Sequence, residues 1–275
     1  MHPELFHIGK FVVPTYGFAF SFSISLGVIL SYRRAKVEGI NQERMLTAML
    51  LGVIGIILMS KASHIITNWD WYVAKPKRFF DFRRGHVFYG GYIGGILLPF
   101  IYVKLVRERF LPMLDIWMTY TGLGLAIHRA IGCLGAGCCH GKPTDLPWGI
   151  TYPPSAPASQ EFGQVPVHPT QLYESALGLF IFFFLLYWRK RHRKVAGELF
   201  AWQAGIYAVG RFIIEFYRGD TDRGYYGPLS TSQWVGIAML FVVGAMVLYI
   251  VRKRKELKLA EATSKSGKKP ARPKK

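Results

Sequence analysis

The stretch YYGPLSTSQWVGIAMLFVVGAMVLYIV (225–251) contains 27 residues and no charged side chain. A second uncharged stretch, FVVPTYGFAFSFSISLGVILSY (11–32), contains 22 residues. A helix that crosses a bilayer needs about 20 predominantly apolar residues, and a soluble core helix rarely contains so many. Both stretches therefore predict membrane-spanning helices, one near each end of the 275-residue chain.

The composition between these stretches extends the same prediction to the whole chain. Hydrophobic residues make up 51% and charged residues 19%, which is too apolar for a disordered chain and argues against a soluble enzyme. The N-terminus lacks the pattern of a removable signal peptide. We predict an all-α polytopic membrane protein with about seven transmembrane helices. The predicted spans are residues 14–32, 45–66, 88–105, 112–131, 171–188, 197–217 and 232–251.

The net charge of +19 invites a nucleic-acid interpretation, but the basic residues lie between the apolar runs. With the N-terminus outside and the C-terminus inside, 23 of the 35 Lys and Arg residues fall on the inner side, as the positive-inside rule requires. Residues 252–275 hold 11 basic and two acidic residues, so we predict a transmembrane domain (1–251) followed by a disordered cytoplasmic tail near anionic lipid. We predict no nucleic-acid partner.

The longest connection, from about residue 132 to residue 169, is external in this orientation and contains seven prolines. A loop of this length in a compact protein is more often functional than idle. Polar residues gather beside it. Arg211, Glu215 and Arg218 share one helix face, either as a self-neutralising ion pair or as a site where guanidinium groups bind a phosphate. Arg129 is a second anion-binding candidate, or else extends its charged end toward water.

Two further groups allow more than one interpretation. Three histidines could serve as bases near neutral pH or pack as hydrogen-bonded residues: His128, His140 and His168. The glycines at the start of the third span either surround a phosphate or let helices pack closely: Gly90, Gly91, Gly94 and Gly95.

The three cysteines, Cys133, Cys138 and Cys139, lie within seven residues, which is not the spread of a disulfide framework. Their spacing matches no tetrahedral metal signature, and adjacent cysteines do not readily both chelate one ion. We therefore predict no metal site and no other cofactor, and a structural role for the cysteines.

Five stretches in this order carry a resemblance to a known family: YGGYIGG (89–95), GCLGAGCCHGKPTDLPWG (132–149), HPTQLYES (168–175), GRFIIEFYRGD (210–220) and GPLSTSQW (227–234). Together with Tyr16-Gly17 at the start of the first span, they resemble the bacterial prolipoprotein diacylglyceryl transferases over residues 12–250. The resemblance implies a plasma-membrane enzyme with its active site toward the outer leaflet. Its partners would be phosphatidylglycerol, surrounding membrane lipids and prolipoprotein signal peptides with a lipobox cysteine. The diacylglyceryl group moves to that cysteine, a thioether forms and glycerol phosphate leaves.

The resemblance also implies roles for individual residues. The implied catalytic residues are Arg211, Tyr89, His86 and Glu215. The implied phosphatidylglycerol-binding residues are Arg129, Tyr16, Gly90, Gly91, His168, Gln171, Tyr173, Glu174, Arg218 and Gln233. Arg129 would hold the phosphate, Arg211 would stabilise charge on the leaving phosphate, and Glu215 would orient Arg211. The HPTQLYE residues would shape the head-group region, and Gln233 would cap the last span.

Two positions differ from the family pattern. Tyr89 stands directly before Gly-Gly, where many members have a histidine, so Tyr89 would order the head group while His86 or a water takes the thiol proton. Arg129 stands one residue earlier than usual before Ile-Gly, a rotation of about 100° on a helix. Two alternatives remain open: a divergent member acting on another lipid or thiol, and a transporter without covalent chemistry, which would explain buried charges.

Overall fold

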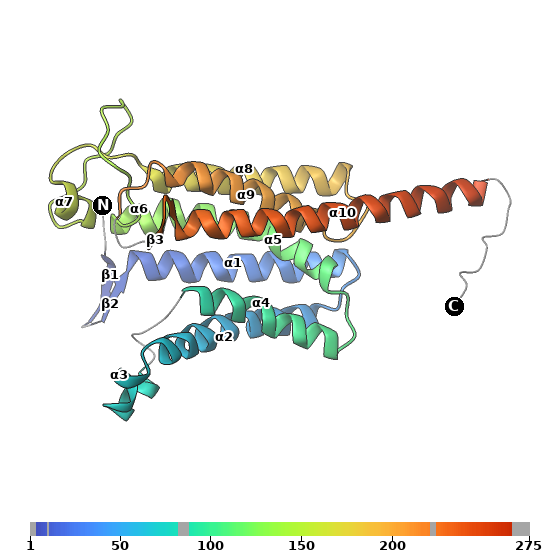
Figure 1. Cartoon of the computed structure of the whole chain (residues 1–275), viewed down its shortest axis with the longest axis horizontal. Coiled ribbons are helices and arrows are strands. Elements are labelled where there is room, and N and C mark those ends of the chain that lie inside the picture. Colours follow the sequence, from blue (N-terminus) through green and yellow to red (C-terminus); the bar gives the residue numbers. More distant parts are fainter. Residues whose placement is uncertain (1–3, 10, 82–87, 221–223, 266–275) are drawn as a thin grey trace. The chain divides into compact units, whose positions relative to one another are not determined.

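The structure, a computed structural model, describes residues 4–9, 11–81, 88–220 and 224–265 (Figure 1). Long helices occupy the seven predicted spans: α1 (Thr15–Val37), α2 (Gln42–Thr67), α4 (Phe88–Leu105), α5 (Phe110–Ile127), α8 (Thr170–Arg191), α9 (Glu198–Glu215) and α10 (Thr231–Lys265). The shorter elements are β1 (Glu4–Ile8), β2 (Phe11–Pro14), α3 (Trp69–Val73), η1 (Pro76–Phe80), η2 (His128–Cys133), α6 (Leu134–Ala136), α7 (Pro157–Phe162), β3 (Tyr225–Tyr226) and β4 (Leu229–Ser230). The predicted all-α membrane fold class is confirmed.

In the described part of the chain, five helices are long and apolar enough to cross a membrane: Thr15–Val37, Gln42–Thr67, Phe110–Ala136, Thr170–Arg191 and Thr231–Ser264. The described apolar part of α4 is shorter, Ile93–Leu105. Helix α9 carries three charged residues, Glu198, Arg211 and Glu215, within its 18 positions. Helices therefore lie at all seven predicted spans, and five of them are long and apolar enough to cross a membrane. The described apolar part of α4 is too short to meet this standard, and α9 carries too many charged residues.

The chain divides into two compact units, Val28–Met113 and the remainder, Met1–Gly27 with Leu114–Lys275. In the Val28–Met113 unit, α2 and α4 pack directly against each other through glycines. A Cβ atom at Gly94 would collide with the backbone oxygen of Gly55, and one at Gly90 would collide with the Ser63 hydroxyl. These glycines therefore serve close helix packing.

The other unit contains α5, α8, α9 and α10, with α9 packed between α8 and α10 (Figure 1). Ile181, Leu185 and Leu199 form a fully buried apolar cluster between α8 and α9. The long connection after α6 is ordered and has a core of its own, built from Tyr152, Ala156, Ala158 and Val167. The unit thus combines a helix bundle with a folded loop at one of its ends.

The predicted tail begins as helix, because α10 continues through Lys265. The segment RKRKELKLAEATSK (252–265) is rich in Lys, Glu, Leu and Ala, which favour helix. Lys253 and Glu256, one turn apart, form an exposed ion pair of 2.7 Å. The disorder predicted from residue 252 is therefore replaced by helix as far as Lys265, and residues 266–275 lie outside the described residues.

Candidate active site

A π-helical turn, η2, continues helix α5 and carries Arg129 as its second residue. A π-helical turn closes hydrogen bonds from i to i+5, so it absorbs one extra residue inside an α-helix. The one-residue shift of Arg129 relative to the family pattern coincides with this turn. The Arg129 Nε atom lies 3.0 Å from Oε2 of Glu174, so the shift does not turn this guanidinium away from the neighbouring helix.

Glu174 lies at the centre of an arginine cluster. Its side chain is fully buried in the first turns of α8. Two further arginines lie near this carboxylate. The Arg218 Nη1 atom is 3.0 Å from Oε1 of Glu174, and the Arg211 Nε atom is 3.9 Å from the same oxygen. Three guanidinium groups from three separate segments therefore converge on one carboxylate.

Two more carboxylates complete the cluster. Glu215 pairs with Arg211 one helical turn away. Asp220 accepts two hydrogen bonds from Arg218, at 2.8 Å from Nε and 2.6 Å from Nη2. The surplus positive charge expected for Arg211, Glu215 and Arg218 does not persist, because the three arginines, Arg129 included, meet three carboxylates once Glu174 and Asp220 are included. Sequence reasoning missed Asp220, although it stands only two residues after Arg218.

The three arginines differ in how accessible they are. The Arg129 side chain is 18% exposed and that of Arg211 is 12% exposed, whereas that of Arg218 is 4% exposed. Among the described residues, the buried Nε of Arg129 has no aligned hydrogen-bond acceptor despite its closeness to Glu174. Arg129 and Arg211 can therefore receive an anion, while Arg218 is enclosed by Asp220 and Glu174.

The HPTQLYES stretch mainly organises the loop. Gln171 donates a hydrogen bond of 2.7 Å to the Cys138 carbonyl, and Thr170 donates one of 2.7 Å to the Cys139 carbonyl. Both side chains are fully buried, so Gln171 holds the cysteine turn in place. The Tyr173 hydroxyl connects two side chains. It lies 3.1 Å from Nδ1 of His168 and accepts a hydrogen bond of 2.8 Å from the indole N–H of Trp148. Burial lowers the pKa of His168.

The remaining predicted residues fall into three groups. Tyr16 packs edge-on against His128, with ring centroids 4.7 Å apart. Gln233 caps α10 reciprocally, accepting from the Ser230 N–H at 3.0 Å while its own N–H donates to the Ser230 hydroxyl. Gly90, Gly91 and the backbone of Tyr89 belong to the Val28–Met113 unit. His86 and the side chain of Tyr89 lie outside the described residues, so their roles stay predictions.

The fold and this cluster define a multi-pass helical membrane protein with three arginines gathered around one buried carboxylate. A family model described as prolipoprotein diacylglyceryl transferase matches residues 3–250, and the chain belongs to this family. The resemblance inferred from the sequence is thereby confirmed.

Named relatives match over most of the chain. The phosphatidylglycerol–prolipoprotein diacylglyceryl transferase of Clostridium tetani is 37% identical over 258 residues, which cover 93% of this chain and all of the relative. A protein of Clostridium perfringens, the phosphatidylglycerol–prolipoprotein diacylglyceryl transferase 2, is 36% identical over 88% of this chain and 91% of the relative. The phosphatidylglycerol–prolipoprotein diacylglyceryl transferase of Clostridioides difficile is 32% identical over 87% of this chain and 91% of the relative.

Proposed function

We propose that the protein transfers the diacylglyceryl group of phosphatidylglycerol to the lipobox cysteine of prolipoproteins. The thiol sulfur bonds to the glyceryl carbon, the bond from that carbon to the phosphate oxygen breaks, and glycerol phosphate leaves with the electron pair. The observation that carries this proposal is the pair of accessible arginines, Arg129 and Arg211, beside the buried Glu174. The names of the relatives support the same reaction.

The two accessible arginines suit successive tasks. Arg129 holds the phosphate of the lipid, because a guanidinium donates two parallel hydrogen bonds to phosphate oxygens. Arg211, positioned by Glu215, stabilises the charge that grows on the leaving phosphate. Glu174 offsets the mutual repulsion of the arginines, which lets Arg129 and Arg211 approach one phosphate. Arg218 is a positioning residue, since its donors are taken by Asp220 and Glu174.

An apolar cavity of about 690 Å³ runs between α8, α9 and α10. Its walls include Leu177, Val209, Leu240 and Val243, and it reaches Gly210, which directly precedes Arg211. A diacylated lipid needs apolar space next to the groups that bind its phosphate. The cavity supplies this space, so one acyl chain can lie there while the head group meets Arg211.

The charges at the ends of α8 support the proposed orientation. Glu174 lies in the first turns of this helix, and Arg189, Lys190 and Arg191 lie in its last turn. Basic residues favour the cytoplasmic side of a membrane. This charge pattern supports our proposal that the arginine cluster around Glu174 faces the outer leaflet of the bacterial plasma membrane, where exported prolipoproteins arrive, with the C-terminus inside.

The thiol proton needs an acceptor, for which the sequence offers His86 or a water, while Tyr89 would order the head group. A double variant, His86→Ala with Tyr89→Phe, should transfer lipid much more slowly than the wild type. An intact rate would remove both residues from the reaction and leave the proton to water.

The test is an assay with purified protein in detergent, phosphatidylglycerol labelled in its acyl chains, and a lipobox peptide carrying Cys or Ser. Label should appear on the Cys peptide alone. Arg211→Ala should lower the rate about 10²- to 10³-fold, the loss typical for one charge-stabilising donor. Arg44→Ala is the matched control, because Arg44 also pairs with a carboxylate, Glu108, but at an exposed position.

Three outcomes of this assay would contradict the proposal. Label on the Ser peptide would show that no thiol is needed. Consumption of a different lipid or modification of a different thiol would indicate a divergent family member. A folded wild-type protein that binds lipid without consuming it would indicate a non-catalytic membrane protein such as a transporter.

A further inference from the structure

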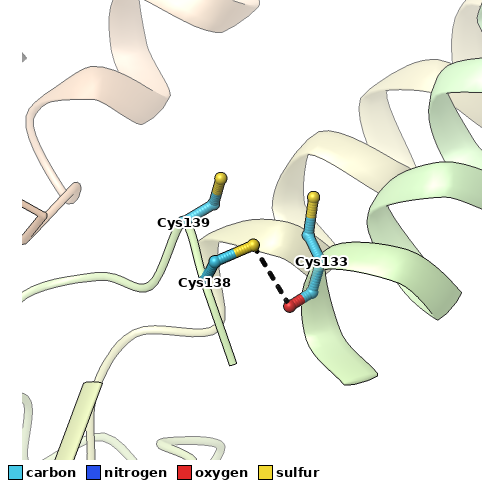
Figure 2. A group of neighbouring side chains, drawn as sticks. All are labelled: Cys133, Cys138 and Cys139. Carbon is cyan, nitrogen blue, oxygen red and sulfur yellow. Dashed lines mark hydrogen bonds between the residues drawn. The ribbon is translucent and has the colours of Figure 1, made fainter. Parts of the chain in front are cut away.

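The three cysteines form one cluster although the sequence analysis predicted only a structural role for them. The sulfur atoms of Cys133, Cys138 and Cys139 all lie within 4.8 Å of one another (Figure 2). Cys133 is buried at the end of η2, and the other two are half-buried at the start of the long loop. All cysteines of the chain are thus gathered at one point.

The backbone of Cys139 explains how two adjacent cysteines reach the same point. Its φ of 61° is left-handed, which costs a residue other than glycine about 1–3 kcal/mol. In an extended chain, neighbouring side chains point to opposite faces. The left-handed residue removes that alternation, so the argument from sequence that adjacent cysteines cannot share a ligand does not apply here.

Buried hydrogen bonds hold this conformation in place. The carbonyl groups of Cys138 and Cys139 accept from Gln171 and Thr170, both at 2.7 Å, and both donors are fully buried. Such supporting bonds orient the residues that bind a metal and raise its affinity. The cluster is therefore held by its surroundings and does not result from a chance approach of flexible side chains.

A fourth donor lies beside the thiols. The Nε2 atom of His128 is 3.6 Å from the Cys133 sulfur, and the buried Nδ1 atom of the same ring has no hydrogen-bond partner among the described residues. The rings of Tyr16 and Phe20 pack edge-on against this imidazole and restrict it. The ring is thus held near the Cys133 sulfur, and its Nδ1 atom has no hydrogen-bond partner among the described residues.

We propose that Cys133, Cys138, Cys139 and His128 bind a soft divalent metal ion of the zinc class. Three thiolates and one imidazole are a common tetrahedral zinc set, with zinc–sulfur bonds of about 2.3 Å. Binding releases the thiol protons and leaves the site with one net negative charge. Arg129 compensates this charge, because its Nη1 atom lies 3.5 Å from the Cys133 sulfur. The site shares Arg129 with the proposed phosphate site, but metal binding by the thiols can be measured without lipid transfer.

The first test titrates Co²⁺, a spectroscopic substitute for zinc, into the reduced full-length protein in detergent without oxygen. One ion per chain should give thiolate-to-cobalt charge-transfer bands and the visible bands of tetrahedral cobalt, and Zn²⁺ should abolish both. Each Cys→Ser variant and His128→Gln should weaken cobalt binding about 10-fold or more. The matched control is His192→Gln, at the C-terminal end of α8, which should leave the titration unchanged.

A second test needs no variant and so does not depend on the folding of one. In the wild type, Zn²⁺ should slow alkylation of Cys138 and Cys139 about tenfold or more, since a metal-bound thiolate must first be released. Free thiols that alkylate equally with and without Zn²⁺, and give no charge-transfer band, would overturn the proposal. A disulfide within the cluster of the protein purified without oxygen would also overturn it.

Discussion

Asp115 on α5 and Glu174 on α8 are both fully buried carboxylates of the bundle, and they are held in different ways. Asp115 accepts hydrogen bonds from the backbone N–H groups of Gly197, at 2.9 Å, and Phe200, at 3.0 Å, at the start of α9. It also pairs with Arg193 at 3.2 Å. By contrast, all the described ion-pair partners of Glu174 are guanidinium groups.

Under the proposed function, this difference separates a structural carboxylate, Asp115, from one that organises the proposed phosphate-binding arginines, Glu174. Asp115 satisfies the free N–H groups and the positive dipole at the beginning of a helix, so its oxygens are committed to the fold. Glu174 faces Arg129 and Arg211, each of which has five donors and uses only some of them among the described residues. A carboxylate paired with incompletely used arginines therefore indicates a site, and one that caps a helix does not.

The two carboxylates also stand at opposite ends of the helix bundle. Helix α8 carries Glu174 near its beginning and Arg189 near its end. Arg189 donates one hydrogen bond of 3.2 Å to the Asp115 carbonyl and one of 2.6 Å to the Thr119 hydroxyl. The end of α8 that carries Arg189 therefore lies at the same end of the bundle as Asp115. Fifteen residues of helix separate the two ends by about 22 Å. Variants at each end can therefore be compared without direct contact between them.

The largest effect is expected from Glu174→Gln. Removing this charge leaves Arg129, Arg211 and Arg218 close together without their shared counter-ion. Breaking a buried ion pair in this way costs about 3–5 kcal/mol, so thermal unfolding in detergent should begin at a much lower temperature. Lipid transfer should be lost as well. A Glu174→Gln protein as stable as the wild type would show that the arginines do not need the carboxylate.

Asp115→Asn should have a smaller effect, and on stability alone. An amide oxygen can still accept one of the two backbone bonds, so the loss is about 1–3 kcal/mol of folding free energy. Unfolding temperature and transfer rate are measured on the same preparation, the rate well below the unfolding temperature. Loss of transfer in a protein that remains folded would contradict the division between a structural and a functional end.

Glycerol phosphate, the proposed leaving group, offers a smaller but more direct comparison. At ten times its dissociation constant it should stabilise the wild type by about 1.4 kcal/mol, since it binds only the folded protein. Arg129→Ala should abolish this stabilisation, because that arginine is the proposed phosphate ligand. Arg193→Ala, at the Asp115 end, should retain it. Equal stabilisation of both variants would mean that the anion binds elsewhere.

Sequence alone predicted the helices well because the length and apolarity of a membrane-spanning helix are set by the bilayer. The long uncharged stretches 11–32 and 225–251 predicted α1 and α10. The end of α10 was not predicted, because the cluster of charges after residue 251 indicated a tail rather than a helix. Helix-forming residues at positions 252–265 outweighed that signal.

The sequence predicted which residues belong to the site but not how they are arranged in space. Arg129, Arg211 and Glu174 were named individually, yet their convergence depends on how η2, α8 and α9 pack. The cysteine cluster depends on the left-handed backbone of Cys139, and the position of Arg129 depends on a π-helical turn. Both are local departures from regular backbone that tertiary contacts impose, and composition and spacing carry no signal for them.

The smallest predicted effect concerns pH and the loop at the Glu174 end. The Tyr173 hydroxyl accepts from Trp148 and can donate to Nδ1 of His168 only while that nitrogen is unprotonated. Burial holds the pKa of His168 below its ordinary value of about 6.5, so the folded protein binds this proton less readily than the unfolded chain. The stability that the folded protein gains from an unprotonated His168 is complete above the ordinary pKa of about 6.5. This stability is lost as the pH falls from about 6.5 toward the lower pKa of His168 in the folded state.

The measurement is the unfolding temperature of the wild type and of His168→Gln between about pH 8 and about pH 5. Glutamine can accept from Tyr173 and does not titrate, so the variant should lose less stability than the wild type as the pH falls. Parallel curves would show that His168 takes up its proton equally in both states. The Tyr173 hydroxyl would then donate to another acceptor, and the loop at the Glu174 end would not depend on the charge of His168.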